Sequence, residues 1–114
     1  MTVVEICVED VVSVRRARDG GADRIEICTD LSCGGLTPAF DEVAAALEVA
    51  PAGGVQVLVR PRPGNFVHSR EEVDRIASDI VTLRAIGRGA DVRLGFVVGV
   101  LADDGSINVD AAAR

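Results

Sequence analysis

Two thiols and two carboxylates occupy alternating positions in two short apolar segments. Cys7 follows Glu5 by two residues, and Cys28 follows Glu26 with the same spacing. Side chains of a β-strand alternate between its faces, so each thiol would share a face with a carboxylate. Two thiolates on adjacent strands would offer a site for a soft metal ion of low coordination number. A free cysteine is more often a small buried hydrophobe, so both interpretations stay open here.

Two arginines and an asparagine follow a third apolar segment. Arg60 ends the segment 55–60, and Arg62 and Asn65 come just after it. Charged groups on an inward strand face are costly unless they are paired, so Glu5, Glu26 and Arg60 could form a structural network. The same groups could place a carboxylate for proton transfer and a guanidinium for an anionic substrate. The sequence favours neither role, and it identifies no catalytic residue.

The elements that would position these residues alternate between strand and helix patterns. Asp10 can cap the first helix, and Thr37 and Pro38 look like the cap and first position of the second. Ser69 and Glu72 have the spacing of a capping box on the third. A fourth helix would start near Asn108. The expected strands cover residues 3–8, 23–28, 55–60 and 93–101, and the first three expected helices cover about 10–19, 37–50 and 69–87.

Four strand–helix units fit either a small open sheet or part of a barrel. An open parallel sheet is buried on both faces, so its strands are apolar almost throughout. The polar residues on one side of the first three strands favour a barrel with a polar interior. A complete (β/α)8 barrel takes ~250 residues. We therefore predict an α/β fold, a partial TIM barrel in which residues 1–114 form one half-barrel domain truncated in its fourth helix.

The composition of the chain limits the classes of partner that it could bind and its location in the cell. The formal net charge is -6, which argues against a nucleic-acid surface. No apolar run is long enough to span a membrane, and the N-terminus lacks the features of a secretory signal. Three cysteines without a secretory context suggest free thiols in a reducing compartment, so we expect a cytoplasmic protein. Unpaired edges on the first and fourth strands predict a homo-oligomer.

Several motifs, in this order, resemble the CutC copper-homeostasis family over nearly the whole chain. They are Glu5-Ile6-Cys7-Val8, the run from Gly20 to Cys28, Gly34-Gly35-Leu36-Thr37-Pro38, Val59-Arg60-Pro61-Arg62 and the run from Gly99 to Gly105. The resemblance implies the N-terminal half of a cytoplasmic, commonly oligomeric TIM-barrel protein associated with copper tolerance and proposed to bind Cu(I). Cys7 and Cys28 match the positions proposed for copper.

Three residues depart from the family pattern in one loop. Asn65 stands where the family usually has Asp, His68 where it usually has Tyr, and Pro63 where it usually has Gly. Three hypotheses follow: a Cu(I)-binding protein of copper homeostasis, a barrel enzyme acting on a small anionic metabolite, or an inactive truncated fragment. In the enzyme, Glu26 would be the acid or base, and Arg60 and Arg62 would bind the anion.

Overall fold

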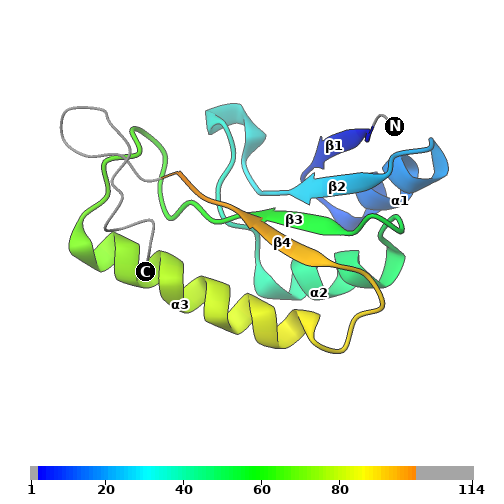
Figure 1. Ribbon diagram of the computed structural model, residues 1–114. Coiled ribbons are helices and arrows are strands. Elements are labelled where there is room, and N and C mark those ends of the chain that lie inside the picture. Colours follow the sequence, from blue (N-terminus) through cyan, green and yellow to red (C-terminus); the bar gives the residue numbers. More distant parts are fainter. Residues whose placement is uncertain (1–2, 100–114) are drawn as a thin grey trace.

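The structure, a computed structural model, describes residues 3–99 of the 114-residue chain. Within this range, strands and helices alternate along the sequence (Figure 1). The elements are β1 (Glu5–Val8), α1 (Val11–Asp19), β2 (Arg24–Ile27), the 3-10 helix η1 (Leu31–Cys33), α2 (Phe40–Val49), β3 (Val55–Leu58), α3 (Arg70–Gly87) and β4 (Leu94–Val97).

The strands form one parallel sheet in the order β1-β2-β3-β4. Helix α1 contacts β1 and β2, α2 contacts β3, and α3 contacts β4, so the helices cover one face of the sheet (Figure 1). Sequential parallel strands with every helix on one side are the arrangement of a (β/α)8 barrel, whereas a doubly wound sheet carries helices on both faces. The prediction of an α/β fold built as a partial barrel is confirmed.

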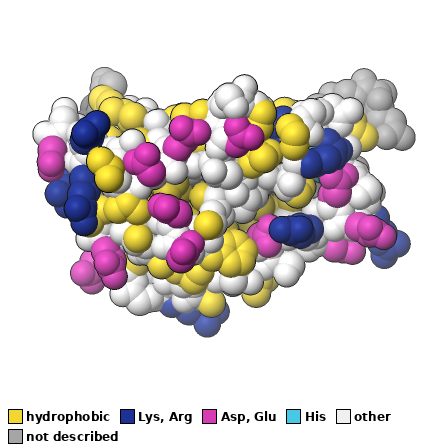
Figure 2. Space-filling view, turned by 180° about the vertical axis from the view of Figure 1, so that it is seen from behind, with side chains coloured by type: hydrophobic (Ala, Val, Ile, Leu, Met, Phe, Trp, Pro, Cys, Tyr) yellow, Lys and Arg dark blue, Asp and Glu magenta, His cyan; other side chains and the backbone are white. Residues whose placement is uncertain are grey.

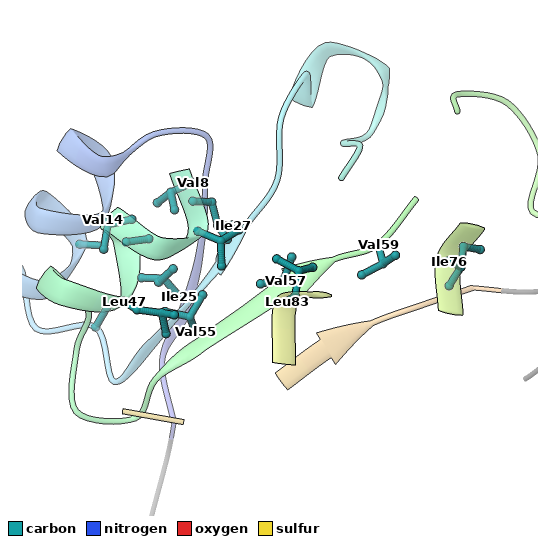
Figure 3. Close-up of a cluster of buried hydrophobic side chains, with 14 residues drawn as sticks. Val8, Val14, Ile25, Ile27, Leu47, Val55, Val57, Val59, Ile76 and Leu83 are labelled. Carbon is teal, nitrogen blue, oxygen red and sulfur yellow. The ribbon is translucent and has the colours of Figure 1, made fainter. Parts of the chain in front are cut away.

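The core lies between the sheet and its helices. Ile25, Ile27, Val55 and Val57 are fully buried on the helix-facing side of β2 and β3. Figure 3 shows these side chains packed with residues from all three helices, including Val14 of α1. Burying each such side chain stabilises the fold by roughly 1.5–3 kcal/mol. The alternating apolar positions therefore fix which face of the sheet meets the helices.

Helix starts follow the predicted caps in two of three cases. Asp10 caps α1, with its Oδ1 accepting from the Ser13 N–H at 2.7 Å, and Ser69 and Glu72 form the complete capping box of α3. The Thr37 cap was wrong, because α2 begins at Phe40 and its N-cap position makes no side-chain hydrogen bond.

The reason for this difference lies in β3. The Thr37 N–H donates to the Arg60 carbonyl at 3.0 Å, and the Thr37 hydroxyl accepts from the Arg60 N–H at 2.8 Å. Thr37 therefore binds the end of β3 and is not available to cap a helix.

The predicted fourth strand was also too long, since β4 ends at Val97. The expected fourth helix near Asn108 lies outside the described residues.

Candidate functional site

The face of the sheet that points away from the helices carries the chemistry predicted from the sequence. We call it the inner face and define it by Glu5, Cys7, Arg24, Glu26, Cys28, Gln56, Leu58 and Gly95. The register aligns Glu5 with Arg24, and it places Cys7, Glu26, Gln56 and Gly95 in one row across the four strands. Cys28 follows Glu26 by two residues and so continues the same face. Both thiols and both carboxylates therefore lie on the predicted side.

Cys7 is exposed at the outer strand of this face. The pKa of its thiol is raised, first by loss of solvation and then by the negative charges of Glu26 and Glu5. Because the thiolate is the metal ligand and the nucleophile, these neighbours keep Cys7 in its less reactive, protonated form. A cation bound here would be attracted by the same two carboxylates.

Cys28 is buried, with 2% of its surface exposed. Burial raises the pKa of its thiol to about 11, and the charges of Cys7, Glu26, Glu9 and Cys33 act in the same direction. Its Sγ donates weakly to the Val8 carbonyl at 3.8 Å. At neutral pH Cys28 is a protonated thiol, so any metal that binds its sulfur must displace a proton.

Gly35 closes over Cys28 from the loop after β2. Its φ is 96°, in the left-handed region that favours glycine, and a Cβ atom added there would lie 3.2 Å from the Cys28 Sγ and 2.9 Å from Leu58. The Gly34-Gly35 pair therefore lets the loop backbone approach the buried thiol. The sequence showed the glycine pair without showing that it covers Cys28.

Glu5 pairs with a residue that the sequence analysis had not selected. The Arg24 Nε donates to Glu5 Oε1 at 2.7 Å, across adjacent strands of the inner face. Both side chains are partly exposed, and an exposed pair of this kind contributes about 0–1 kcal/mol. The cross-strand spacing, with both residues on the polar side of their strands, was the available signal for this pair.

Arg60 lies apart from the carboxylates and is buried, with 7% exposure. Its guanidinium donates to the backbone carbonyls of Cys33, Gly35 and Gly64 at 3.1, 3.0 and 2.7 Å, and it lies 4.9 Å from the ring centre of Phe66. Its Nε has no hydrogen-bond partner. Arg60 thus connects the loops that follow β2 and β3, and the predicted network with Glu5 and Glu26 does not include it.

Arg62 and Asn65 come together within the loop after β3. Arg62 donates to the carbonyls of Pro63, Asn65 and Val67, and its Nε forms an ion pair with Glu72. The Asn65 Oδ1 accepts from the Val67 N–H at 3.2 Å and lies 3.5 Å from Arg62 Nη2. Both side chains therefore brace this loop against the start of α3.

His68 and Cys33 contact the backbone rather than each other. The His68 Nε2 lies 3.1 Å from the Gly99 carbonyl, and the Cys33 Sγ donates to the Asp30 carbonyl at 3.2 Å. Among residues 3–99, no group of three or more His, Cys, Asp and Glu side chains is arranged to hold a metal ion. Within that range, Cys7 and Cys28 are the two thiols on the inner face, and Cys33 lies at the end of η1.

A cavity of about 360 Å³ adjoins Arg60. Thr37, Phe40 and Arg75 line it together with Arg60, but neither predicted thiol nor Glu26 does. Over one face of the molecule, acidic side chains are spread among hydrophobic ones (Figure 2). None of the helices in residues 3–99 combines the length and apolar character needed to cross a bilayer.

Known proteins that are similar to this chain in sequence and in structure belong to one family. The curated relatives include a family protein CutC from Aliivibrio fischeri, 37% identical over 97% of this chain and 42% of its own length. Another, from Agrobacterium fabrum, is 41% identical over 94% of this chain and 40% of its own length. The chain therefore spans about two fifths of the length of these relatives.

A solved structure agrees with the sequence comparisons. A candidate copper homeostasis protein CutC from Streptococcus agalactiae superposes with a TM-score of 0.84 and 28% identity, covering 99% of this chain and 52% of that one. The CutC family model matches residues 2–114. The barrel-like sheet order, the motifs and these matches agree, and the chain belongs to the CutC family.

Proposed function

We propose that this chain acts in copper homeostasis by binding Cu(I) through Cys7 and Cys28 on the inner face. The observation that supports this most directly is the position of the two thiols on one face of adjacent strands, close enough that the charge of Cys7 affects the pKa of Cys28. Cu(I) accepts soft thiolate ligands at low coordination number, so two sulfurs suffice.

The surroundings of the thiols suit a cation. Glu26 and Glu5 lie near Cys7, and Glu26 and Glu9 act on Cys28. Their negative charge disfavours a free thiolate but attracts a metal ion. Binding would exchange the thiol protons for the metal, so the apparent affinity should rise with pH.

A cytoplasmic location is part of this proposal. All three cysteines are free, and a reducing compartment keeps thiols available for Cu(I). The copper homeostasis role named for the Streptococcus agalactiae protein supports the proposed copper function and carries no information on location.

The alternative, an enzyme acting on a small anionic metabolite, has less support from the geometry. The guanidinium groups of Arg60 and Arg62 are both engaged by backbone carbonyls, and Arg62 also pairs with Glu72. Glu26 lies in the row of Cys7 rather than beside either arginine. Anion binding would require these contacts to be broken first.

The test is a titration of the reduced 114-residue chain with Cu(I) against a chromophoric competitor chelator. We expect one strong site in the wild-type chain and its loss in Cys7→Ser and in Cys28→Ser. Cys33→Ser is the matched control, because Cys33 is a loop thiol that bonds to a backbone carbonyl, and it should bind like the wild type. Equal binding by all four proteins would refute the proposal.

A further inference from the structure

The loop after β2 covers the buried thiol of Cys28. We call residues 29–36 the strap; they include η1 and lie on the side of the sheet away from α2 and α3 (Figure 1). The first and last residues of the strap, Thr29 and Leu36, exchange backbone hydrogen bonds at 2.9 and 2.7 Å. A Cβ atom added to Gly35 would lie 3.2 Å from the Cys28 Sγ, so the strap backbone passes directly over this inner-face thiol. Cys28 beneath it is 2% exposed.

Two side chains from outside the strap hold it against the sheet. Glu9, which follows β1, accepts from the Leu31 N–H through its Oε1 at 2.6 Å. Arg60, which follows β3, donates to the carbonyls of Cys33 and Gly35 at 3.1 and 3.0 Å. The strap is therefore attached near its start by a carboxylate and near its end by a guanidinium.

Apolar packing contributes little to holding the strap in place. Leu31 is 41% exposed, and within the strap only Gly35 is buried. The strands beneath it, in contrast, contain fully buried residues such as Ile27 and Val57. Segments with few buried apolar contacts open locally at a small cost in free energy, without unfolding the rest of the chain. The strap can therefore open while the sheet stays folded.

We propose that the strap is a lid on Cys28, held closed by Glu9 and Arg60, and that a ligand reaches the sulfur only after the strap opens. The identity of that ligand rests on the proposed function, in which Cu(I) passes the strap to reach Cys28. Opening breaks the hydrogen bonds from Glu9 and Arg60 together, so weakening either one raises the open fraction. This fraction then sets how fast a ligand can reach the thiol.

The test is the rate at which N-ethylmaleimide alkylates each cysteine of the reduced, metal-free chain, followed by mass spectrometry of its peptides. Glu9→Ala removes one contact that holds the strap, and Cys28 should react about tenfold faster, because one charge-assisted hydrogen bond no longer opposes opening. Glu9→Gln is the matched control. It removes the same negative charge but keeps an oxygen that accepts from the Leu31 N–H, so Cys28 should react within about threefold of the wild-type rate. The exposed Cys7 is the internal reference in every sample.

A second pair of variants opens the strap without changing any charge. Gly35→Ala places a Cβ atom 2.9 Å from Leu58 and 3.2 Å from the Cys28 Sγ, so the strap cannot close fully and Cys28 should again react several times faster. Gly21→Ala is the matched control, because its φ of 98° is close to the 96° of Gly35 but an added Cβ atom there has no neighbour within 4 Å. Its Cys28 should react at the wild-type rate. Far-UV circular dichroism checks that every variant is folded.

An unchanged Cys28 rate in either Glu9→Ala or Gly35→Ala would overturn the proposal. Equal rates in Glu9→Ala and Glu9→Gln would do the same, because the charge of Glu9 rather than its hydrogen bond would then set the rate. So would a wild-type rate that rises with urea as steeply as global unfolding does, since Cys28 would then be reached only by unfolding the whole chain.

The copper titration keeps this proposal separate from the proposed function. Faster alkylation of Cys28 in both strap variants, in a chain that binds no Cu(I), would support the lid and refute only the copper function. Cu(I) binding by the wild type together with unchanged alkylation rates would refute only the lid.

Discussion

Ile25 and Glu26 are neighbours in β2, but they lie on opposite faces of the sheet. Ile25 is fully buried against the helices in an apolar row, whereas Glu26 is half-buried among polar side chains on the inner face. The helix-facing side is held by close packing, and the inner face is left with groups that can bind or exchange protons. In this molecule, stability and chemistry are therefore divided between alternate residues of the same strands.

The largest expected change in the free energy of unfolding tests this division between the two faces. Ile25→Ala removes a fully buried side chain from the centre of the core, and we expect it to lower the free energy of unfolding by about 4 kcal/mol. Glu26→Gln is the matched change on the inner face, and we expect it to alter stability by less than about 0.5 kcal/mol. Urea denaturation measures both. Comparable losses would show that the inner face is also structural.

Arg60 is an exception to this division between the two faces. It continues the inner face of β3, but it is buried and donates hydrogen bonds to three backbone carbonyls. Lysine keeps the charge but cannot reach three acceptors with a planar group. We expect Arg60→Lys to lower the free energy of unfolding by about 3 kcal/mol. Arg62→Lys, at a more exposed guanidinium, should cost about 1 kcal/mol. Urea denaturation measures both losses. A larger loss for Arg62→Lys than for Arg60→Lys would contradict the structural role of Arg60.

The third expected effect is a change of stability with pH at Cys28. Its pKa is raised from the ordinary value of 9.0 to about 11, so the folded chain holds this proton more tightly than the unfolded chain. Raising the pH therefore favours unfolding, with the loss beginning near pH 9 and complete above about pH 11.

The check compares the wild type with Cys28→Ala across that range of pH. The difference in unfolding free energy between them should shrink as the pH rises, whereas a Cys33→Ala variant should follow the wild type. A constant difference would show that the Cys28 thiol ionises normally in the folded chain.

The sequence predicted the faces of the sheet because apolar and polar residues alternate in the first three strands. It also predicted the α3 capping box, because that interaction is local and depends on Ser69 and Glu72 alone. The Thr37 cap was wrong because a contact with the distant end of β3 took the place of a local one. The spacing of apolar and polar residues does not indicate contacts between distant segments of the chain.

The hydrogen-bond acceptors of Arg60 also could not be predicted from the sequence. Its acceptors are main-chain carbonyls of Cys33, Gly35 and Gly64, and a carbonyl acceptor leaves no mark in residue type. The alternation did place Arg60 toward the inner face, but it could not show that the loops would fold over the guanidinium. The copper ligands stay a prediction, supported by the placement of Cys7 and Cys28 and tested by the titration.

The anchoring of two loops by Arg60 has a consequence for how this chain tolerates change. Every amino acid carries a carbonyl oxygen, so a substitution such as Cys33→Ala leaves the acceptor for Arg60 in place. Saturation mutagenesis of residues 31–33 should therefore recover many folded variants, while the same library at residue 60 should recover few. Loop surfaces held by the Arg60 guanidinium can diversify without losing their shape, which makes this end of the sheet a suitable place to introduce new binding specificities.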